Sequence, residues 1–223
     1  NPSGERVRNG RRYDRLHDLE HTEDILRRSF PQYLNRIEEK SITLQSIPNK
    51  CILRRYDPRE KLREIIEKPE GDLQKTITKL AESLQNKGVP QRAIGVSGSL
   101  LIDLAGPDSD VDIIVYGMEN GRKAYETLRE LRNEKEWITA YDEESVASVV
   151  RSRWADSGLD LNKLWSMEAQ KVLHGRVEGR DYFFRLLKLP HEVEIEDVSR
   201  PLGVVRLNAR IVDAEEAIFT PCS

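Results

Sequence analysis

The sequence predicts an α/β (α+β) protein with a core of mixed sheet and flanking helices, an N-terminal α+β lobe and a small β-rich C-terminal lobe. Two short apolar runs, 93–96 and 111–116, have the composition of buried strands. A glycine-serine turn and an apolar helix join them, and stretches with helical spacing of apolar residues lie on both sides. We therefore expect three lobes, at residues 1–90, 91–190 and 191–223.

The N-terminal lobe begins with helical and then strand-like segments. Apolar residues recur at helical spacing between residues 22 and 39, where Pro31 divides the pattern into two short helices. The runs 42–47 and 51–56 are typical of strands and are separated by a turn, which predicts a small hairpin.

Two further helices are expected before the lobe ends. Asp57-Pro58 is a typical helix start, and Asp72 can cap the helix that follows. Gly88 and Pro90 stop that helix and mark the boundary of the lobe.

The middle lobe alternates strands and helices, and the C-terminal lobe has further strand-like runs. The expected elements are strand 93–96, a short helix after Gly98, strand 111–116, helix 121–131, strand 137–141, helices 144–153 and 162–174, strand 182–189, and C-terminal strands at 203–212 and 217–219.

Two aspartates at the start of a strand carry the clearest chemical signal. Side chains alternate along a strand, so Asp110 and Asp112 point to one face while Val111, Ile113 and Val115 point to the core. Two carboxylates side by side are hard oxygen ligands for a divalent cation such as Mg²⁺ or Mn²⁺. Such cations neutralise the charge of a nucleoside triphosphate during phosphoryl transfer.

The turn before this strand supplies a second element of the site. Glycine at position 98 lets the backbone approach a phosphate, and the helix that follows presents free N–H groups there. The hydroxyl of Ser99 adds another donor. No Gly-Lys-Ser/Thr follows, so the turn is not a Walker-type phosphate loop.

Gly98-Ser99 followed by Ser109-Asp110-Val111-Asp112 resembles the signature of the DNA polymerase β-type nucleotidyltransferase superfamily, with spacing closest to its minimal members. The whole chain is also similar to uncharacterised archaeal proteins described as predicted nucleotidyltransferases. The resemblance implies that Gly98 and Ser99 bind the β and γ phosphates and that Asp110 and Asp112 ligate magnesium.

The resemblance also implies a third carboxylate on a neighbouring strand, which helps to hold the metal and accepts the proton of the attacking hydroxyl. Asp181, at the start of a strand, is the first choice and Asp142 the second. Many small members have arginines after the Gly-Ser pair, where this chain has leucines. We therefore expect Arg185 or Arg180 to meet the triphosphate charge.

The sequence leaves two classes of function open. The first is a metal-dependent transferase that moves a nucleoside monophosphate from a nucleoside triphosphate to an acceptor hydroxyl and releases pyrophosphate. The acceptor is then an RNA, a protein or a small molecule. The second is an inactive nucleotidyltransferase-fold module that binds nucleotide, RNA or a protein partner.

Composition adds limits on partners and compartment. The 36 Lys and Arg residues nearly balance the 39 Asp and Glu residues, so the net charge of −3 gives no overall signal for nucleic acid. An arginine-rich stretch at residues 6–15 is expected to be a solvated arm rather than a phosphate contact. No apolar run approaches the about 20 residues that cross a bilayer. Cys51 and Cys222 predict no disulfide framework, so we expect a cytoplasmic protein of undefined oligomeric state.

Overall fold

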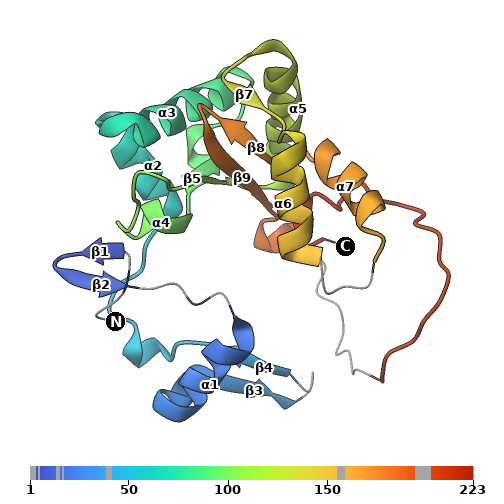
Figure 1. Ribbon diagram of the computed structural model, residues 1–223. Coiled ribbons are helices and arrows are strands. Elements are labelled where there is room, and N and C mark those ends of the chain that lie inside the picture. Colours follow the sequence, from blue (N-terminus) through green and yellow to red (C-terminus); the bar gives the residue numbers. More distant parts are fainter. Residues whose placement is uncertain are drawn as a thin grey trace. The chain divides into compact units, whose positions relative to one another are not determined.

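The computed structural model describes residues 4, 6–13, 16, 18–38, 42–154, 159–193 and 202–222 (Figure 1). The chain divides into two compact units, Asn1–Tyr56 with Glu194–Glu215, and Asp57–Val193 with Glu216–Ser223. The expected boundaries at residues 90 and 190 do not coincide with this division. None of the described helices combines the length and the apolar character that crossing a membrane requires.

The first unit contains two small antiparallel hairpins and one helix. In chain order these are β1 (Arg6–Arg8), β2 (Arg11–Tyr13), α1 (Leu19–Ser29), β3 (Leu34–Ile37) and β4 (Ile42–Gln45). Helix α1 has no buried residue, so its amphipathic face contributes little to a core.

Three expectations for this unit are wrong in detail. The helix expected after Pro31 is a single 3-10 turn followed by β3, because β3 pairs along its whole length with β4. The strand expected at 51–56 is absent, and only the 3-10 turn Asn49–Cys51 forms there. The arginine-rich stretch forms the β1–β2 hairpin, with Arg8 Nη1 donating to the Tyr56 hydroxyl at 2.8 Å. Residues 14 and 15 of that stretch lie outside the described residues.

The second unit is built on one mixed sheet, as the sequence predicts. Its strands are β5 (Ile94–Val96), β6 (Val111–Tyr116), β7 (Ile138–Thr139), β8 (His174–Val177), β9 (Arg180–Leu187) and β10 (Phe219–Thr220). The order is β5-β6-β9-β8-β7, with β10 paired to β9. The β6–β9 and β9–β10 pairs are parallel and the other pairs are antiparallel.

One face of this sheet is the core of the unit. Val111, Ile113 and Val115 of β6 are at most 1% exposed, and they lie on the same face as Tyr182 and Phe184 of β9. This face is covered by α3 (Gly71–Asn86) and α5 (Met118–Glu134), whose buried side chains belong to the same apolar cluster. The opposite face carries the acidic side chains and is only partly buried.

The two helices that precede the sheet belong to it rather than to the first unit. Helix α2 (Pro58–Glu67) begins at Asp57, which caps it by accepting from Arg59 N at 2.8 Å. It packs against β5 at Gly95, where a Cβ would lie 2.7 Å from the Cβ of Pro58. The boundary expected at residue 90 therefore falls inside a continuous core.

The remaining helices are close to their expected positions. Helix α4 (Gly98–Leu101) is a single turn, whereas α6 (Glu143–Trp154) and α7 (Leu161–Gln170) pack against each other. Helix α7 ends before the expected residue 174, because His174 pairs with Phe183 as the first residue of β8.

The β-rich C-terminal lobe is not formed in the described residues. Residues 202–214 contain no helix or strand, and residues 194–201 lie outside the description. Apolar side chains such as Val204 and Ile211 stay exposed, because no described strand pairs with this segment. The chain rejoins the second unit at Glu216, and Phe219 is 3% exposed in the core of that unit. Helix α5 makes room for this ring at Gly121, where a Cβ would lie 2.5 Å from Phe219 Cε1.

We expect Phe219→Ala to lower the free energy of unfolding by about 3–5 kcal/mol, because it leaves a cavity between β9 and α5. Val212→Ala, at a side chain 93% exposed in the same C-terminal segment, should change it by less than about 0.5 kcal/mol. Urea denaturation measures both. Equal effects of the two changes would show that the C-terminal segment does not anchor the sheet.

Candidate active site

The acidic residues lie on the open face of the two central parallel strands. Asp110 directly precedes β6, and Asp112 pairs in register with Phe183 of β9. Because β6 and β9 are parallel, continuing this register by two residues places Asp181 beside Asp110 on the same face. The register thus places Asp181, the first choice for the third carboxylate, on the same face as the Asp110-Asp112 pair and on the neighbouring strand.

The glycine turn meets the acidic strand directly. Gly98 has φ +63°, in the left-handed region, and a Cβ there would lie 1.9 Å from Asp112 Oδ2. The backbone N–H of Ser97 donates to the carbonyl of Asp112 at 2.9 Å. Only glycine therefore lets the turn and the Asp112 carboxylate come this close.

The Ser99 hydroxyl is hydrogen-bonded within the chain segment that joins the glycine turn to the aspartates. It donates to Ser109 Oγ at 3.1 Å, and Ser109 Oγ accepts from the backbone N–H of Gly106 at 2.8 Å. Ser109 is 8% exposed, and the carbonyl of Ser99 accepts from Leu104 N at 2.8 Å. These bonds fix the segment between the turn and the aspartates, so a phosphate that uses the Ser99 hydroxyl must compete with Ser109.

Arg180, at the start of β9, also contacts the segment that joins the glycine turn to the aspartates. Its Nη1 donates to the carbonyl of Pro107 and approaches that of Ser109 at 3.5 Å, just before Asp110. Arg185 lies on the acidic face, opposite Ile114 in register, and is exposed. Of the two arginines considered for the triphosphate, Arg185 is the one whose guanidinium is not engaged by that loop.

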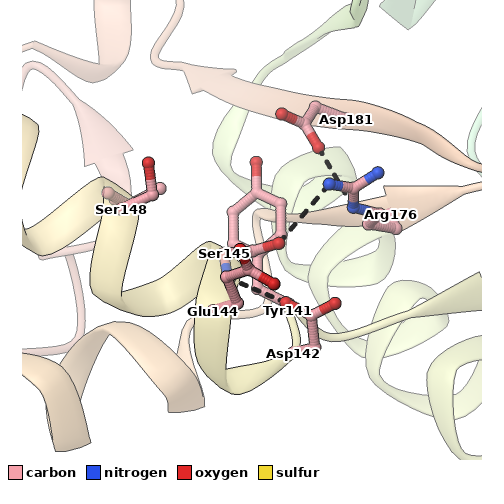
Figure 2. A pocket seen from close by; sticks show the side chains of 8 residues that line it. Tyr141, Asp142, Glu144, Ser145, Ser148, Arg176 and Asp181 are labelled. Carbon is pink, nitrogen blue, oxygen red and sulfur yellow. Dashed lines mark hydrogen bonds and ion pairs between the residues drawn. The ribbon is translucent and has the colours of Figure 1, made fainter.

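Asp181 lies between two pockets. A pocket of about 410 Å³ is lined by Asp110 together with Arg180 and Asp181, and a pocket of about 390 Å³ is lined by Asp142 together with Asp181. Arg176 lines both, and its Nε lies 3.5 Å from Asp181 Oδ1 (Figure 2). This oxygen is buried and accepts no hydrogen bond, so it retains capacity for a proton or a cation.

The second choice for the third carboxylate has a different environment. Asp142 caps α6 by accepting from the backbone N–H of Ser145 at 2.8 Å. Hydrogen bonds from Ser145 hold the pKa of the Asp142 carboxyl below its usual range. Asp142 does not line the pocket that contains Asp110. Asp142 therefore lines a different pocket from Asp110, whereas Asp181 lines both pockets.

The described residues contain no group of three His, Cys, Asp or Glu side chains gathered closely enough to hold a metal ion. The donor chemistry nevertheless fits a hard divalent cation, because Asp110, Asp112 and Asp181 are all carboxylates on one face of the sheet. Asp110 and Asp112 are the residues that would hold it.

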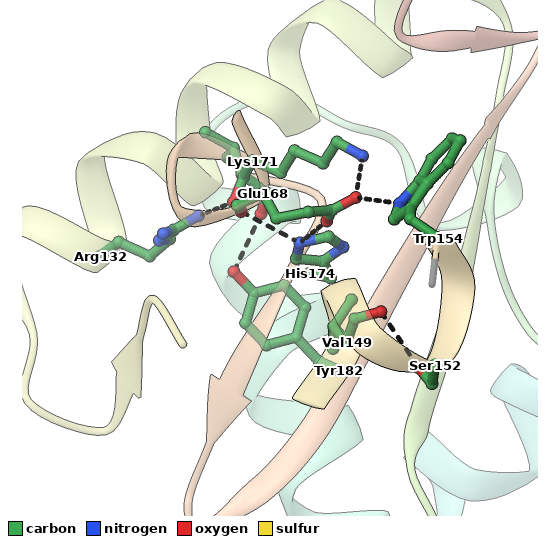
Figure 3. A network of polar contacts seen from close by, with 9 residues as sticks. Arg132, Val149, Ser152, Trp154, Glu168, Lys171, His174 and Tyr182 are labelled. Carbon is green, nitrogen blue, oxygen red and sulfur yellow. Dashed lines mark hydrogen bonds and ion pairs between the residues drawn. The ribbon is translucent and has the colours of Figure 1, made fainter. Parts of the chain in front are cut away.

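A buried polar network joins α7 to β8 and β9 (Figure 3). Glu168 is 3% exposed, and its carboxylate lies 2.6 Å from Lys171 Nζ and 3.3 Å from His174 Nε2. The Tyr182 hydroxyl donates to the carbonyl of Val172 at 2.9 Å. Burial raises the pKa of Tyr182 to about 12, so this hydroxyl stays protonated as a donor. The residue next to Asp181 is thereby fixed.

Sequence reasoning missed Arg176 and this network. Arg176 pairs with Asp181 across the β8–β9 hairpin, whose turn contains Glu178 and Gly179 with positive φ. A Glu-Gly pair between two strand-like runs was a usable hairpin signal, and the register would have placed Arg176 opposite Asp181. The contacts of Glu168 with His174 had no comparable signal, because they join a helix to a strand through tertiary packing.

Comparisons with known proteins give one matching family model and one relative. Residues 77–152 match the family model of the nucleotidyltransferase domain, a span that contains Gly98, Asp110 and Asp112 but ends before Asp181. An uncharacterised protein of Methanocaldococcus jannaschii is 27% identical over 220 residues, which cover 96% of this chain. The chain spans 64% of the length of that relative. No solved structure matches the chain.

We expect Gly98→Ala to lower the free energy of unfolding by about 1–3 kcal/mol more than Gly88→Ala does. Both glycines have positive φ, but a Cβ at Gly88 meets nothing within 4 Å, so this control contains only the backbone strain. In proteins that also carry Asp112→Ala, the loss of unfolding free energy caused by Gly98→Ala should no longer exceed the loss caused by Gly88→Ala. Urea denaturation of the four variants measures this, and an unchanged excess would contradict the close approach of Asp112 to the turn.

Proposed function

We propose that this chain, whose residues 77–152 match the family model of the nucleotidyltransferase domain, transfers a nucleoside monophosphate from a nucleoside triphosphate to an acceptor hydroxyl. The observation that carries the proposal is the contact of the Asp112 carboxylate with the Gly98 turn. A phosphate seated on the turn lies next to the acidic strand, which is the arrangement that transfer from a triphosphate requires.

Each of the proposed residues has a separate task. Gly98 and Ser99 bind the β and γ phosphates, and Arg185 meets part of their charge from the neighbouring strand. Arg180 acts as a positioning residue, since its bonds to the carbonyls of Pro107 and Ser109 fix the loop that leads into β6.

In the transfer step, Asp181 accepts the proton of the acceptor hydroxyl through Oδ1, which is ion-paired with Arg176 but accepts no hydrogen bond. The hydroxyl oxygen then forms a bond to the α-phosphorus. The bond from that phosphorus to the bridging oxygen breaks, and pyrophosphate leaves with the electron pair. Mg²⁺ or Mn²⁺, held by Asp110 and Asp112 when bound, supplies neutralisation of the charge on the phosphates.

A second candidate function is a non-catalytic module that binds nucleotide, RNA or a protein partner. It is favoured by one observation, the absence of a ready three-ligand metal cluster among the described residues. Calorimetry with MgATP distinguishes the two functions. Binding without pyrophosphate release, whatever acceptor is added, supports the module, and a labelled product excludes it.

Replacing either metal-binding aspartate should abolish transfer without unfolding the protein. We expect Asp110→Asn and Asp112→Asn to lower pyrophosphate release from α-labelled triphosphates by more than about 100-fold, because the phosphate charge is no longer neutralised. The control is Asp103→Asn, an exposed aspartate that pairs with Lys61 at 2.7 Å. Equal release by all three variants and the unmodified protein would sink the proposal.

The identity of the proton acceptor is tested by the transfer rates of two variants. A general base contributes about 100-fold or more, so Asp181→Asn should lower the rate by that factor. Asp142→Asn should keep the rate within about threefold. If the Asp142 variant loses the activity instead, the second choice of third carboxylate is correct.

A further inference from the structure

The β1–β2 hairpin of the first unit (Figure 1) carries three arginines on one face. Residues directly opposite each other in an antiparallel pair share a face, and so do alternate residues of one strand. The register pairs Arg6 with Tyr13 and Arg8 with Arg11, so these four side chains belong to a single face. Arg8 and Arg11 are direct cross-strand partners, and like charges in that position repel each other.

The turn of the hairpin fixes this arrangement. Asn9 and Gly10 have φ of +50° and +72°, the left-handed backbone that a tight two-residue hairpin turn requires at both positions. The arginine-rich stretch is therefore a ribbon with a defined charged face rather than a free arm.

Two tyrosine rings lie among these charges. The guanidinium carbon of Arg8 is 5.6 Å from the centroid of the Tyr13 ring and 5.8 Å from that of Tyr56. The guanidinium carbon of Arg54 is 4.7 Å from the centroid of the Tyr56 ring. Basic and aromatic groups are thus interleaved on one surface of the first unit. This hairpin patch consists of Arg6, Arg8, Arg11, Tyr13, Arg54 and Tyr56.

Three arginines of the hairpin patch are not paired with an acid in the part of the chain that the structure describes. No ion pair there includes Arg6, Arg11 or Arg54. On helix α1 of the same unit, by contrast, Arg27 Nη2 is 2.7 Å from Glu23 Oε1. The charge of the hairpin patch is therefore available to an external anion.

We propose that the hairpin patch is a docking surface for single-stranded nucleic acid. It belongs to the first unit and lies outside residues 77–152, which match the nucleotidyltransferase domain. Binding there uses neither the acidic residues nor the Gly98 turn, so it is independent of the proposed transfer reaction.

Several guanidinium groups on one ribbon face suit a chain of phosphates. The planar fork of each guanidinium donates two parallel hydrogen bonds to a phosphate, and it remains charged at any physiological pH. A nucleic acid presents one phosphate per nucleotide, so the arginines of one face can engage neighbouring phosphates together. Such contacts also relieve the repulsion between Arg8 and Arg11.

The planar groups of the hairpin patch favour a single strand. Unpaired bases stack on aromatic rings and on guanidinium planes, whereas the bases of a duplex are already stacked on each other. Tyr13 and Tyr56 are only half-buried, and Arg11 and Arg54 are exposed. A membrane-binding surface would add apolar side chains that enter the lipid, and the hairpin patch has none.

The surface is tested by fluorescence anisotropy of the full chain with a labelled RNA of about 12 nucleotides and mixed sequence, in EDTA and without triphosphate. We expect a Kd on the order of 1–100 μM at about 50 mM salt. Arg11→Gln should weaken binding about fivefold or more and lower the slope of log K against log salt concentration by about 0.7, because one phosphate contact is lost.

The matched control is Arg27→Gln, which removes the same charge from α1 of the same unit. It should change the affinity by less than about twofold and leave the salt slope unchanged. Equal effects of the two substitutions would show that only net charge matters and would overturn the docking surface.

A duplex and a lipid vesicle separate the single strand from other polyanions. A duplex has the higher charge density, so a surface that recognises charge alone binds the duplex more tightly. We expect the single strand to bind at least about threefold more tightly than a duplex of the same sequence, because stacking adds to the phosphate contacts. Single-stranded RNA and DNA distinguish the two sources of this ligand, and binding of either supports the surface. Tighter binding of the duplex, or binding of phosphatidylserine vesicles but of neither single strand, would overturn it.

Discussion

The close approach of the Asp112 carboxylate to Gly98 is the contact on which the rest of the site depends. If the turn binds a phosphate, as proposed, the neighbouring carboxylate repels that phosphate unless a cation lies between them. The left-handed backbone of Gly98 and the missing Cβ make the contact sterically possible. The hydrogen bonds of Ser109 and Arg180 then hold the intervening loop.

This contact also explains why the sheet is assembled as it is. The acidic pair needs a strand whose other face is firmly packed, and Val111, Ile113 and Val115 provide that packing against α3 and α5. Parallel pairing with β9 brings in Asp181 from a residue far along the chain. The buried contacts of Glu168 with His174 of β8 and of Tyr182 of β9 with Val172 hold the two strands of this hairpin, so the position of Asp181 depends on α7 as well.

Local signals predicted much of this arrangement. The limits of β6 follow from alternation of apolar and acidic residues, and the turn follows from Gly98-Ser99. The pairing of strands was harder to predict from the sequence. No local pattern indicates that β3 forms where a helix is expected, or that the segment 202–214 forms no strand. The membership of α2 and α3 in the sheet unit was also hidden, because Gly88 and Pro90, which stop the helix before the first strand of the sheet, are typical of a boundary between lobes. The role of Arg176 depended on the register of a hairpin that sequence periodicity leaves undefined.

The measurement that tests the shared metal site most directly is anomalous diffraction from crystals of the protein with Mn²⁺ and a non-hydrolysable triphosphate. We expect a manganese peak within about 2.0–2.3 Å of oxygens from both Asp110 and Asp112, with the β and γ phosphates on the Gly98-Ser99 turn. A triphosphate bound elsewhere, or a manganese peak that touches neither aspartate, would contradict a nucleotidyltransferase site at this turn.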